Sequence, residues 1–222
     1  MTREAPETVR LPIVGVMGSG TDPHPDLAEP LGRWLATLSV HLLTGGGAGV
    51  MECVSRAYCE TPGRSGRTIG ILPHSHGAEI EAAGECAAGR GAERWDEARA
   101  GYPNPWIEIP IFTHLPFTGF RGTDALSRNH INVLSSDVIV ALPGSSGTAS
   151  EIVLARQYGR PLIAFLHRAG EMPDLRAETR WTSDFEEVKR FVSECLREPN
   201  RAARKQDEKR AGPPPPKGTV GP

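Results

Sequence analysis

The stretch that decides the fold covers residues 137–151 and reads DVIVALPGSSGTASE. Its first six residues form an apolar run that predicts a buried strand, and residues 152–158 continue as a helix. A turn rich in glycine and serine lies between them. Such a turn favours an anion, because glycine allows close approach, N–H groups at a helix start are free to donate, and the helix dipole is positive there. We therefore predict a phosphate-binding turn formed by Gly144, Ser145, Ser146, Gly147 and Thr148.

A second turn of this kind lies upstream in residues 40–51, which read VHLLTGGGAGVM. A short apolar strand again runs into glycines and then into a helix. The strand expected at residues 11–17 likewise ends in a small polar turn, which we expect to line the same cleft. Because parallel strands end at one edge of a sheet, these turns predict a nucleotide or phosphosugar site at that edge. The additional candidate ligand-binding residues are Gly18, Ser19, Gly20, Gly45, Gly46, Gly47 and Gly49.

Strands alternate with helices along the chain. We expect strands at residues 11–17, 40–44, 68–72, 106–112, 137–142 and 161–166. We expect helices at residues 26–38, 50–59, 125–134, 150–158 and 184–196, with Thr148 and Ser150 capping the fourth of them. This order predicts a Rossmann-like, doubly wound α/β fold of about seven mostly parallel strands, with helices on both faces.

The chain of 222 residues, 38% of them hydrophobic, fits one domain with a single core. We place that domain at residues 1–196, with an inserted loop region at residues 73–105. Residues 197–222 read as a disordered, basic and proline-rich tail with little apolar content. The net charge of -2 gives no general attraction to nucleic acid. Neither an apolar run of 18 residues nor a secretory leader is evident, so we expect a cytoplasmic protein without a membrane partner.

Lysine, cysteine and histidine usage argues against several classes. All lysines lie beyond Trp181, at Lys189, Lys205, Lys209 and Lys217. A P-loop needs a lysine after its glycines, and a pyridoxal-phosphate enzyme needs a buried one, so neither class is expected. The four cysteines are scattered and predict free thiols. His74 and His76 have no third ligand nearby, so we expect them to be exposed and predict no metal site.

Three further residues carry candidate chemistry. Arg128 and Asn129 belong to the helix before the phosphate-binding turn. Arg128 either binds a phosphate or carboxylate in the cleft or is a surface arginine, and its spacing leaves both alternatives open. Glu151 opposes a bound anion, so it either acts on the ligand or only complements the helix dipole.

Two motifs resemble those of the SLOG superfamily, a group of Rossmann-like proteins often mislabelled lysine decarboxylases. The sequence GGGAGVM at residues 45–51 resembles its GGGxxGxM turn, which adds Met51 to the site. The sequence PGSSGTASE at residues 143–151 resembles its PGGxGTxxE motif. Ser145 stands where that motif has a second glycine, which suits a turn that needs no positive φ there. The resemblance covers about residues 12–196.

One branch of that superfamily implies an enzyme, and this is our first hypothesis. Lonely Guy-type phosphoribohydrolases cut the N-glycosidic bond of a nucleoside 5′-monophosphate such as a cytokinin riboside monophosphate. The products are free base and ribose 5-phosphate. The resemblance implies catalytic roles for Arg128 and Glu151, with Glu151 acting at the sugar and no cofactor required. A carboxylate suits this reaction, because it can stabilise an oxocarbenium-like transition state or activate water.

A second branch implies binding without catalysis, and this is our alternative. Arg128, Asn129, Asn132 and residues 147–152 look closer to the molybdenum cofactor carrier-like group, whose members bind a pterin that carries a phosphate. The same turn would hold that phosphate. A nucleotide sensor, or a partner-binding role for the tail, is a third possibility. The resemblance also implies a homodimer or higher oligomer.

Overall fold

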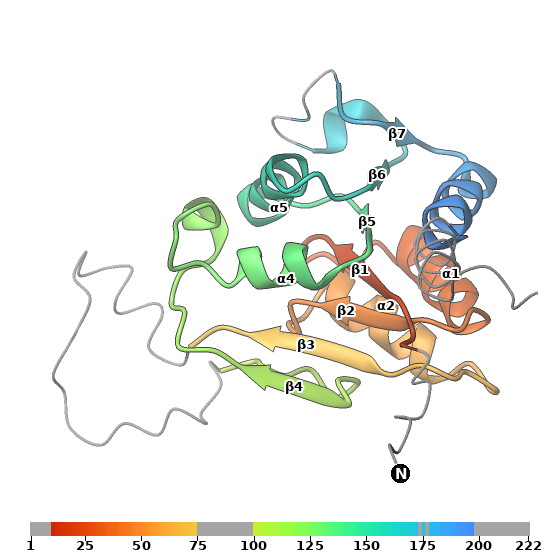
Figure 1. Cartoon of the computed structure of the whole chain (residues 1–222), viewed down its shortest axis with the longest axis horizontal. Helices are drawn as coiled ribbons and strands as arrows, with labels where there is room; N and C mark the ends of the chain where they lie inside the picture. Colours follow the sequence, from red (N-terminus) through yellow and green to blue (C-terminus); the bar gives the residue numbers. More distant parts are fainter. Residues whose placement is uncertain (1–9, 75–99, 173–174, 176–177, 198–222) are drawn as a thin grey trace, which may run out of the picture.

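The computed structural model describes residues 10–74, 100–172, 175 and 178–197. Its seven strands form one parallel sheet in the order β4-β3-β2-β1-β5-β6-β7 (Figure 1). The strands are β1 (Ile13–Met17), β2 (His41–Thr44), β3 (Thr68–Leu72), β4 (Ile109–Phe112), β5 (Val138–Ala141), β6 (Leu162–Phe165) and β7 (Trp181–Thr182). The predicted fold class is therefore confirmed.

Helices cover both faces of the sheet. They are α1 (Pro25–Ala36), α2 (Val50–Cys59), α4 (Asn129–Ser135), α5 (Ser146–Gln157) and a last helix over residues 185–197. Residue alternation along the strands assigns the faces, because successive side chains point to opposite sides. Val14 and Val140 pack with α1, α2 and the last helix, whereas Leu43 and Ile139 pack with α4 and α5. The central strands are buried on both faces, which explains their continuous apolar runs.

The strand order changes direction at β1. The chain runs outward from β1 to β4 on one side and from β5 to β7 on the other. The carboxyl ends of β1 and β5 therefore lie side by side, while the segments that follow them diverge. In open parallel sheets this switch point is where a ligand crevice forms.

Several sequence-based boundaries were wrong. Helix α5 begins at Ser146 rather than Ser150, so Thr148 and Ser150 lie inside the helix and do not cap it. Helix α4 begins only at Asn129, four residues later than predicted, and β4 is confined to residues 109–112. The two-residue β7 was not predicted. Residues 75–99 of the predicted loop region and the tail from residue 198 lie outside the described residues.

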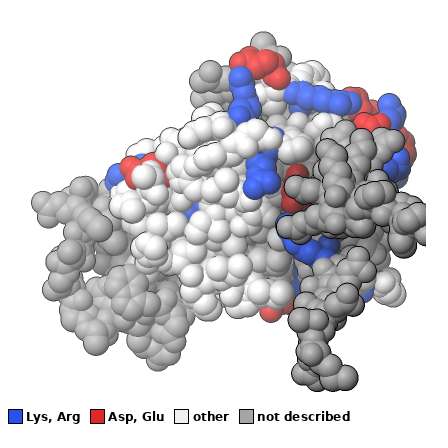
Figure 2. Space-filling view, viewed as in Figure 1, with Lys and Arg blue, Asp and Glu red and all other residues white. Residues whose placement is uncertain are grey.

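The surface in the view of Figure 1 is unevenly charged. Figure 2 shows most of the coloured Lys, Arg, Asp and Glu side chains toward the periphery, with a mainly white surface across the middle that blue side chains interrupt. Helices α4 and α5 lie over this part of the molecule in Figure 1. Leu134 of α4 and Val153 of α5 are both exposed, at 44% and 40% of their area.

Candidate functional site

A cavity of about 160 Å³ opens at the carboxyl edge of the sheet, at the switch point. Ten of the sequence-predicted residues line it: Gly18, Gly20, Gly45, Met51, Arg128, Asn129, Ser145, Gly147, Thr148 and Glu151. The other six predicted residues belong to the same turns but do not line the cavity themselves: Ser19, Gly46, Gly47, Gly49, Gly144 and Ser146. The fold thus brings together the three turns that the sequence pattern singled out.

The turn between β5 and α5 presents the start of a helix to this cavity. The N–H of Ala149 donates to the carbonyl of Ser145, so the N–H groups of Ser146, Gly147 and Thr148 precede that bond. Ser145 has φ -104°, so serine is accommodated where the related motif has glycine. Gly144 is required for space, because a Cβ there would lie 2.1 Å from Oγ1 of Thr148. These backbone donors can hold an anion without a cationic side chain.

The turn after β1 joins the other two. The N–H of Ser19 donates to the carbonyl of Pro143, and the carbonyl of Ser19 accepts a hydrogen bond from the N–H of Val50, each at 2.9 Å. Gly49 has φ +64°, and a Cβ there would lie 2.4 Å from the Ser19 carbonyl oxygen. The three loops are therefore fixed to one another by backbone contacts, which gives the cavity a preformed wall.

Arg128 is neither a surface residue nor a freely extended ligand-binding arm. It lies at the N-cap of α4 and is only 5% exposed. Its Nη1 donates to the carbonyl of Gly45 at 2.7 Å and also to the carbonyl of Ile71. Its Nε is buried and has no hydrogen-bond partner among the described residues. The guanidinium therefore ties the ends of β2 and β3 together in the cavity wall, where it also supplies a positive charge.

Glu151 is a buried carboxyl in the same cavity, 8% exposed. Its Oε1 accepts a hydrogen bond from Nδ2 of Asn132 at 2.8 Å. Burial raises the pKa of Glu151, and the Asn132 hydrogen bond and the charge of Arg128 oppose that shift only in part. The protein therefore favours the neutral carboxylic acid more than water does.

Sequence reasoning missed several residues of the site. Tyr102, Thr118 and Gly119 line the cavity, and Asn104 supports it from outside. They belong to irregular segments or, for Gly119, to the short 3-10 turn Gly119–Arg121, and such segments carry no periodic signal. Asn132 was part of the motif that resembled the carrier group, but its contact with Glu151 follows only from the packing of α4 against α5.

The remaining sequence predictions concern metal binding, the exposure of His74, the cysteine thiols and membrane spans. The described residues contain no group of three or more His, Cys, Asp or Glu side chains placed to hold a metal. His74 is buried, contrary to the predicted exposure. Cys53, Cys59 and Cys195 form no disulfides, and burial raises the pKa of the first two thiols, which makes them poor nucleophiles. No helix in the described part of the chain combines the length and apolarity needed to cross a membrane.

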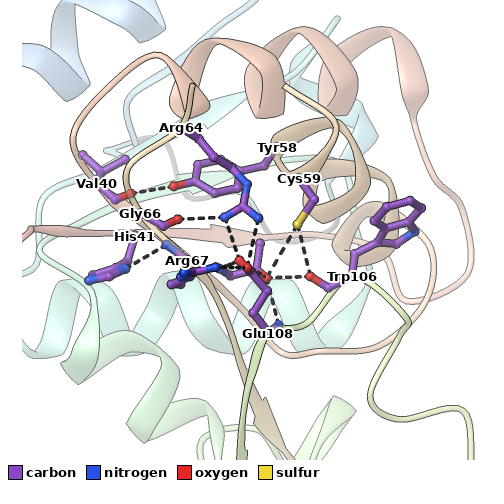
Figure 3. Close-up of polar contacts among 10 residues, drawn as sticks. Val40, His41, Tyr58, Cys59, Arg64, Gly66, Arg67, Trp106 and Glu108 are labelled. Atoms are coloured by element: carbon purple, nitrogen blue, oxygen red, sulfur yellow. Dashed lines mark hydrogen bonds and ion pairs between the residues drawn. The ribbon is translucent and has the colours of Figure 1, made fainter. Parts of the chain in front are cut away.

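A second polar cluster lies at the opposite, amino end of the strands (Figure 3). The carboxylate of Glu108, just before β4, accepts two hydrogen bonds from Arg64, one from Arg67 and one from the backbone of Thr68. These bonds outweigh burial and lower the pKa of Glu108 to about 2. The Trp106 carbonyl accepts from the Thr68 hydroxyl at 2.5 Å. This cluster is saturated by its own members, so its role is to fix the segment before β4 against β3.

The fold and the cavity define a Rossmann-like protein with a glycine- and serine-rich turn beside a cavity at its switch point. The model of the SLOG cluster4 family matches residues 11–195, so the chain belongs to that family. The predicted SLOG relationship is thereby confirmed. No curated protein matches the chain in sequence.

Two solved structures are similar over nearly their whole length. The molybdenum cofactor binding protein from the phototrophic bacterium Rippkaea orientalis is 29% identical, with a TM-score of 0.61, covering 85% of this chain and 99% of its own. The molybdenum cofactor carrier protein of Chlamydomonas reinhardtii is 28% identical, with a TM-score of 0.54, covering 83% and 99%. Both share the α/β fold described above.

Proposed function

We propose that this protein binds the molybdenum cofactor, a pterin carrying a phosphate, and holds it as cargo without changing it chemically. The observation that carries the proposal is that the start of α5, with Ser145, Gly147 and Thr148, lines the cavity. The likeness to a molybdenum cofactor binding protein and a carrier protein supports the choice of ligand.

The cavity suits the phosphate end of such a ligand. The backbone N–H groups of Gly147 and Thr148 would donate to the phosphate, and the helix dipole would favour its charge. The cavity of about 160 Å³ is smaller than the roughly 300 Å³ or more of sites that enclose a whole drug-sized ligand. The phosphate and the adjoining ring would therefore fill it, and the rest of the cargo would lie at its mouth.

The two residues assigned to catalysis in our first hypothesis are both held in the cavity wall by other parts of the chain. Arg128 has its Nη1 committed to the Gly45 and Ile71 carbonyls, so it is restrained from following a reacting sugar. Glu151 is held in a similar way, because its Oε1 accepts a hydrogen bond from Nδ2 of Asn132 at 2.8 Å. Both residues nevertheless line the cavity, which keeps nucleoside 5′-monophosphate hydrolysis as the second candidate function.

One pair of assays separates these functions. The purified protein is titrated with molybdenum cofactor under anaerobic conditions and, separately, incubated with a panel of nucleoside 5′-monophosphates that includes cytokinin types. We expect saturable cofactor binding and recovery of the cofactor unchanged, with no free base in any nucleotide incubation. Release of base and ribose 5-phosphate that disappears in Glu151→Gln would replace the carrier proposal with the hydrolase. Absence of cofactor binding would also overturn it.

A further inference from the structure

An aromatic ring forms the wall of the cavity on the β2 side. Tyr102 is half-buried and lines the cavity together with Gly45 and Arg128. The guanidinium carbon of Arg128 lies 5.5 Å from the centroid of the Tyr102 ring, within cation–π range. The cationic side chain therefore packs on the tyrosine, which limits the positions open to the ring.

The segment that carries this ring is attached to the glycine turn after β2. The backbone N–H of Asn104 donates to the carbonyl of Gly46, and its Nδ2 donates to the carbonyl of Gly47, both at 2.8 Å. Asn104 itself is only 5% exposed. Two residues further on, Trp106 is fixed by Thr68 in the cluster of Figure 3. The ring of Tyr102 is thus held on a short, doubly anchored segment.

Gly47 leaves room for the ring. A Cβ at Gly47 would lie 2.8 Å from Cε1 and Cζ of Tyr102 and 2.9 Å from its hydroxyl oxygen. Any side chain at that position would push the ring away. The glycine at this position and the tyrosine 55 residues later are therefore complementary in shape.

The ring lies at a useful distance from the phosphate-binding turn. That turn follows β5, whereas Tyr102 lies beside the turn after β2, and β1 separates the two strands. Two neighbouring-strand spacings amount to about 10 Å. A phosphate held at the start of α5 would therefore leave a fused heterocycle, attached through a short linker, near the tyrosine.

We infer that Tyr102 is a specificity-determining residue that stacks on the planar heterocycle of the phosphate-anchored ligand, and that Asn104 is the positioning residue that holds it there. The inference rests on the proposed function for the ligand being a pterin. The phosphate turn gives affinity for any phosphate monoester, and the ring of Tyr102 selects those that carry a flat aromatic system, since every such system offers a π-face.

The test compares two substitutions at Tyr102 in the full chain. Neopterin phosphate is the fluorescent probe, inorganic phosphate is the ringless control, and adenosine 5′-monophosphate is the alternative ring ligand. Tyr102→Leu removes the aromatic face, and Tyr102→Phe keeps it. We expect Tyr102→Leu to bind neopterin phosphate about tenfold more weakly and to lose the stacking-induced quenching of pterin fluorescence. Tyr102→Phe should bind within about threefold of wild type, and the affinity for inorganic phosphate should be the same in all three proteins.

Gly47→Ala gives an independent variant, because it displaces the ring without removing it. We expect it to weaken neopterin phosphate binding as Tyr102→Leu does. Equal neopterin phosphate affinity and quenching in wild type and Tyr102→Leu would overturn the inference while leaving the proposed function intact. Tyrosine-dependent binding of adenosine 5′-monophosphate alone would overturn the proposed pterin ligand and support the inference. Failure of wild type to bind either ring ligand would overturn both.

Discussion

A negative charge at Gly147 should abolish phosphate-dependent binding without harming the fold. A Cβ at Gly147 would meet only the backbone of Gly119, at 3.7 and 3.8 Å, which is ordinary van der Waals contact. Gly147 lies in the first turn of α5, where a carboxylate complements the helix dipole and stabilises a helix by about 0.3–1 kcal/mol. Gly147→Asp should therefore be folded and no less stable than wild type, with Gly147→Ala as the control for bulk.

The expected loss of affinity follows from the charge. The Asp carboxylate would lie within a few ångströms of a phosphate bound at the same helix start. Two unit charges about 6 Å apart, at an effective dielectric constant of about 20, repel by about 3 kcal/mol. That energy corresponds to about a hundredfold weaker binding. Gly147→Ala adds one methyl group at ordinary van der Waals distance from Gly119 and should change the affinity by less than about threefold.

The assay is a fluorescence titration of the three proteins with neopterin phosphate and with neopterin lacking the phosphate. The difference between Asp and Ala should shrink at high salt, because ions screen the repulsion. It should also be absent for the unphosphorylated pterin. Equal binding of neopterin phosphate by the Asp and Ala variants, with both folded by circular dichroism, would refute the assignment of the phosphate to this turn.

Three further predictions concern stability and assembly. Burial raises the pKa of Glu151, so the native state binds the carboxyl proton more tightly than the unfolded chain does, and stability falls as pH rises through the native pKa. Glu151→Gln should therefore raise the melting temperature near neutral pH but not in acid. Melting curves recorded across pH test this. The pKa of Glu108 is lowered to about 2, so the contribution of Glu108 to stability is present above the pKa of the unfolded chain and is lost as pH falls from about 4.5 toward 2. Glu108→Gln should lower the free energy of unfolding in urea at pH 7 by about 2 kcal/mol, and equal stability at that pH would contradict the role of the cluster. We also propose that the chain self-associates through the exposed apolar side chains of α4 and α5, Leu134 and Val153. Light scattering should then show a dimer or larger for wild type and a smaller species for the double variant Leu134→Glu, Val153→Lys, and a wild-type monomer would exclude this.

The sheet and the position of the site could be predicted because each depends on local sequence. The runs around Val14, Leu42 and Val140 are apolar in continuous stretches, which parallel strands require. The glycine-rich turns can be recognised from their composition, and the parallel topology brings them to the carboxyl edge of the sheet. By contrast, β7 at Trp181 is two residues long and has no periodicity to detect.

The start of α5 was misplaced because propensity and packing disagree there. Serine, glycine and threonine are weak helix formers, so the sequence predicted a loop as far as Thr148. In the structure, α5 begins at Ser146, and the Ser150 hydroxyl lies within hydrogen-bond distance of two carbonyl oxygens, that of Ser146 at 2.8 Å and that of Gly119 at 3.2 Å. These contacts hold the 3-10 turn Gly119–Arg121 against the helix. They depend on a segment some thirty residues upstream, which no local pattern reveals.

The same kind of long-range information decides what the site can do. A glycine-rich turn at a helix start binds phosphate in a hydrolase and in a carrier alike, so the motif cannot separate them. The motif does not reveal how Arg128 and Glu151 are held, because their partners, Ile71 and Asn132, come from β3 and α4. An arginine bonded to main-chain carbonyls and a carboxyl bonded to an asparagine give a polar, nearly rigid wall. Such a wall needs little reorganisation when a ligand binds, which suits the cargo binding proposed for this site.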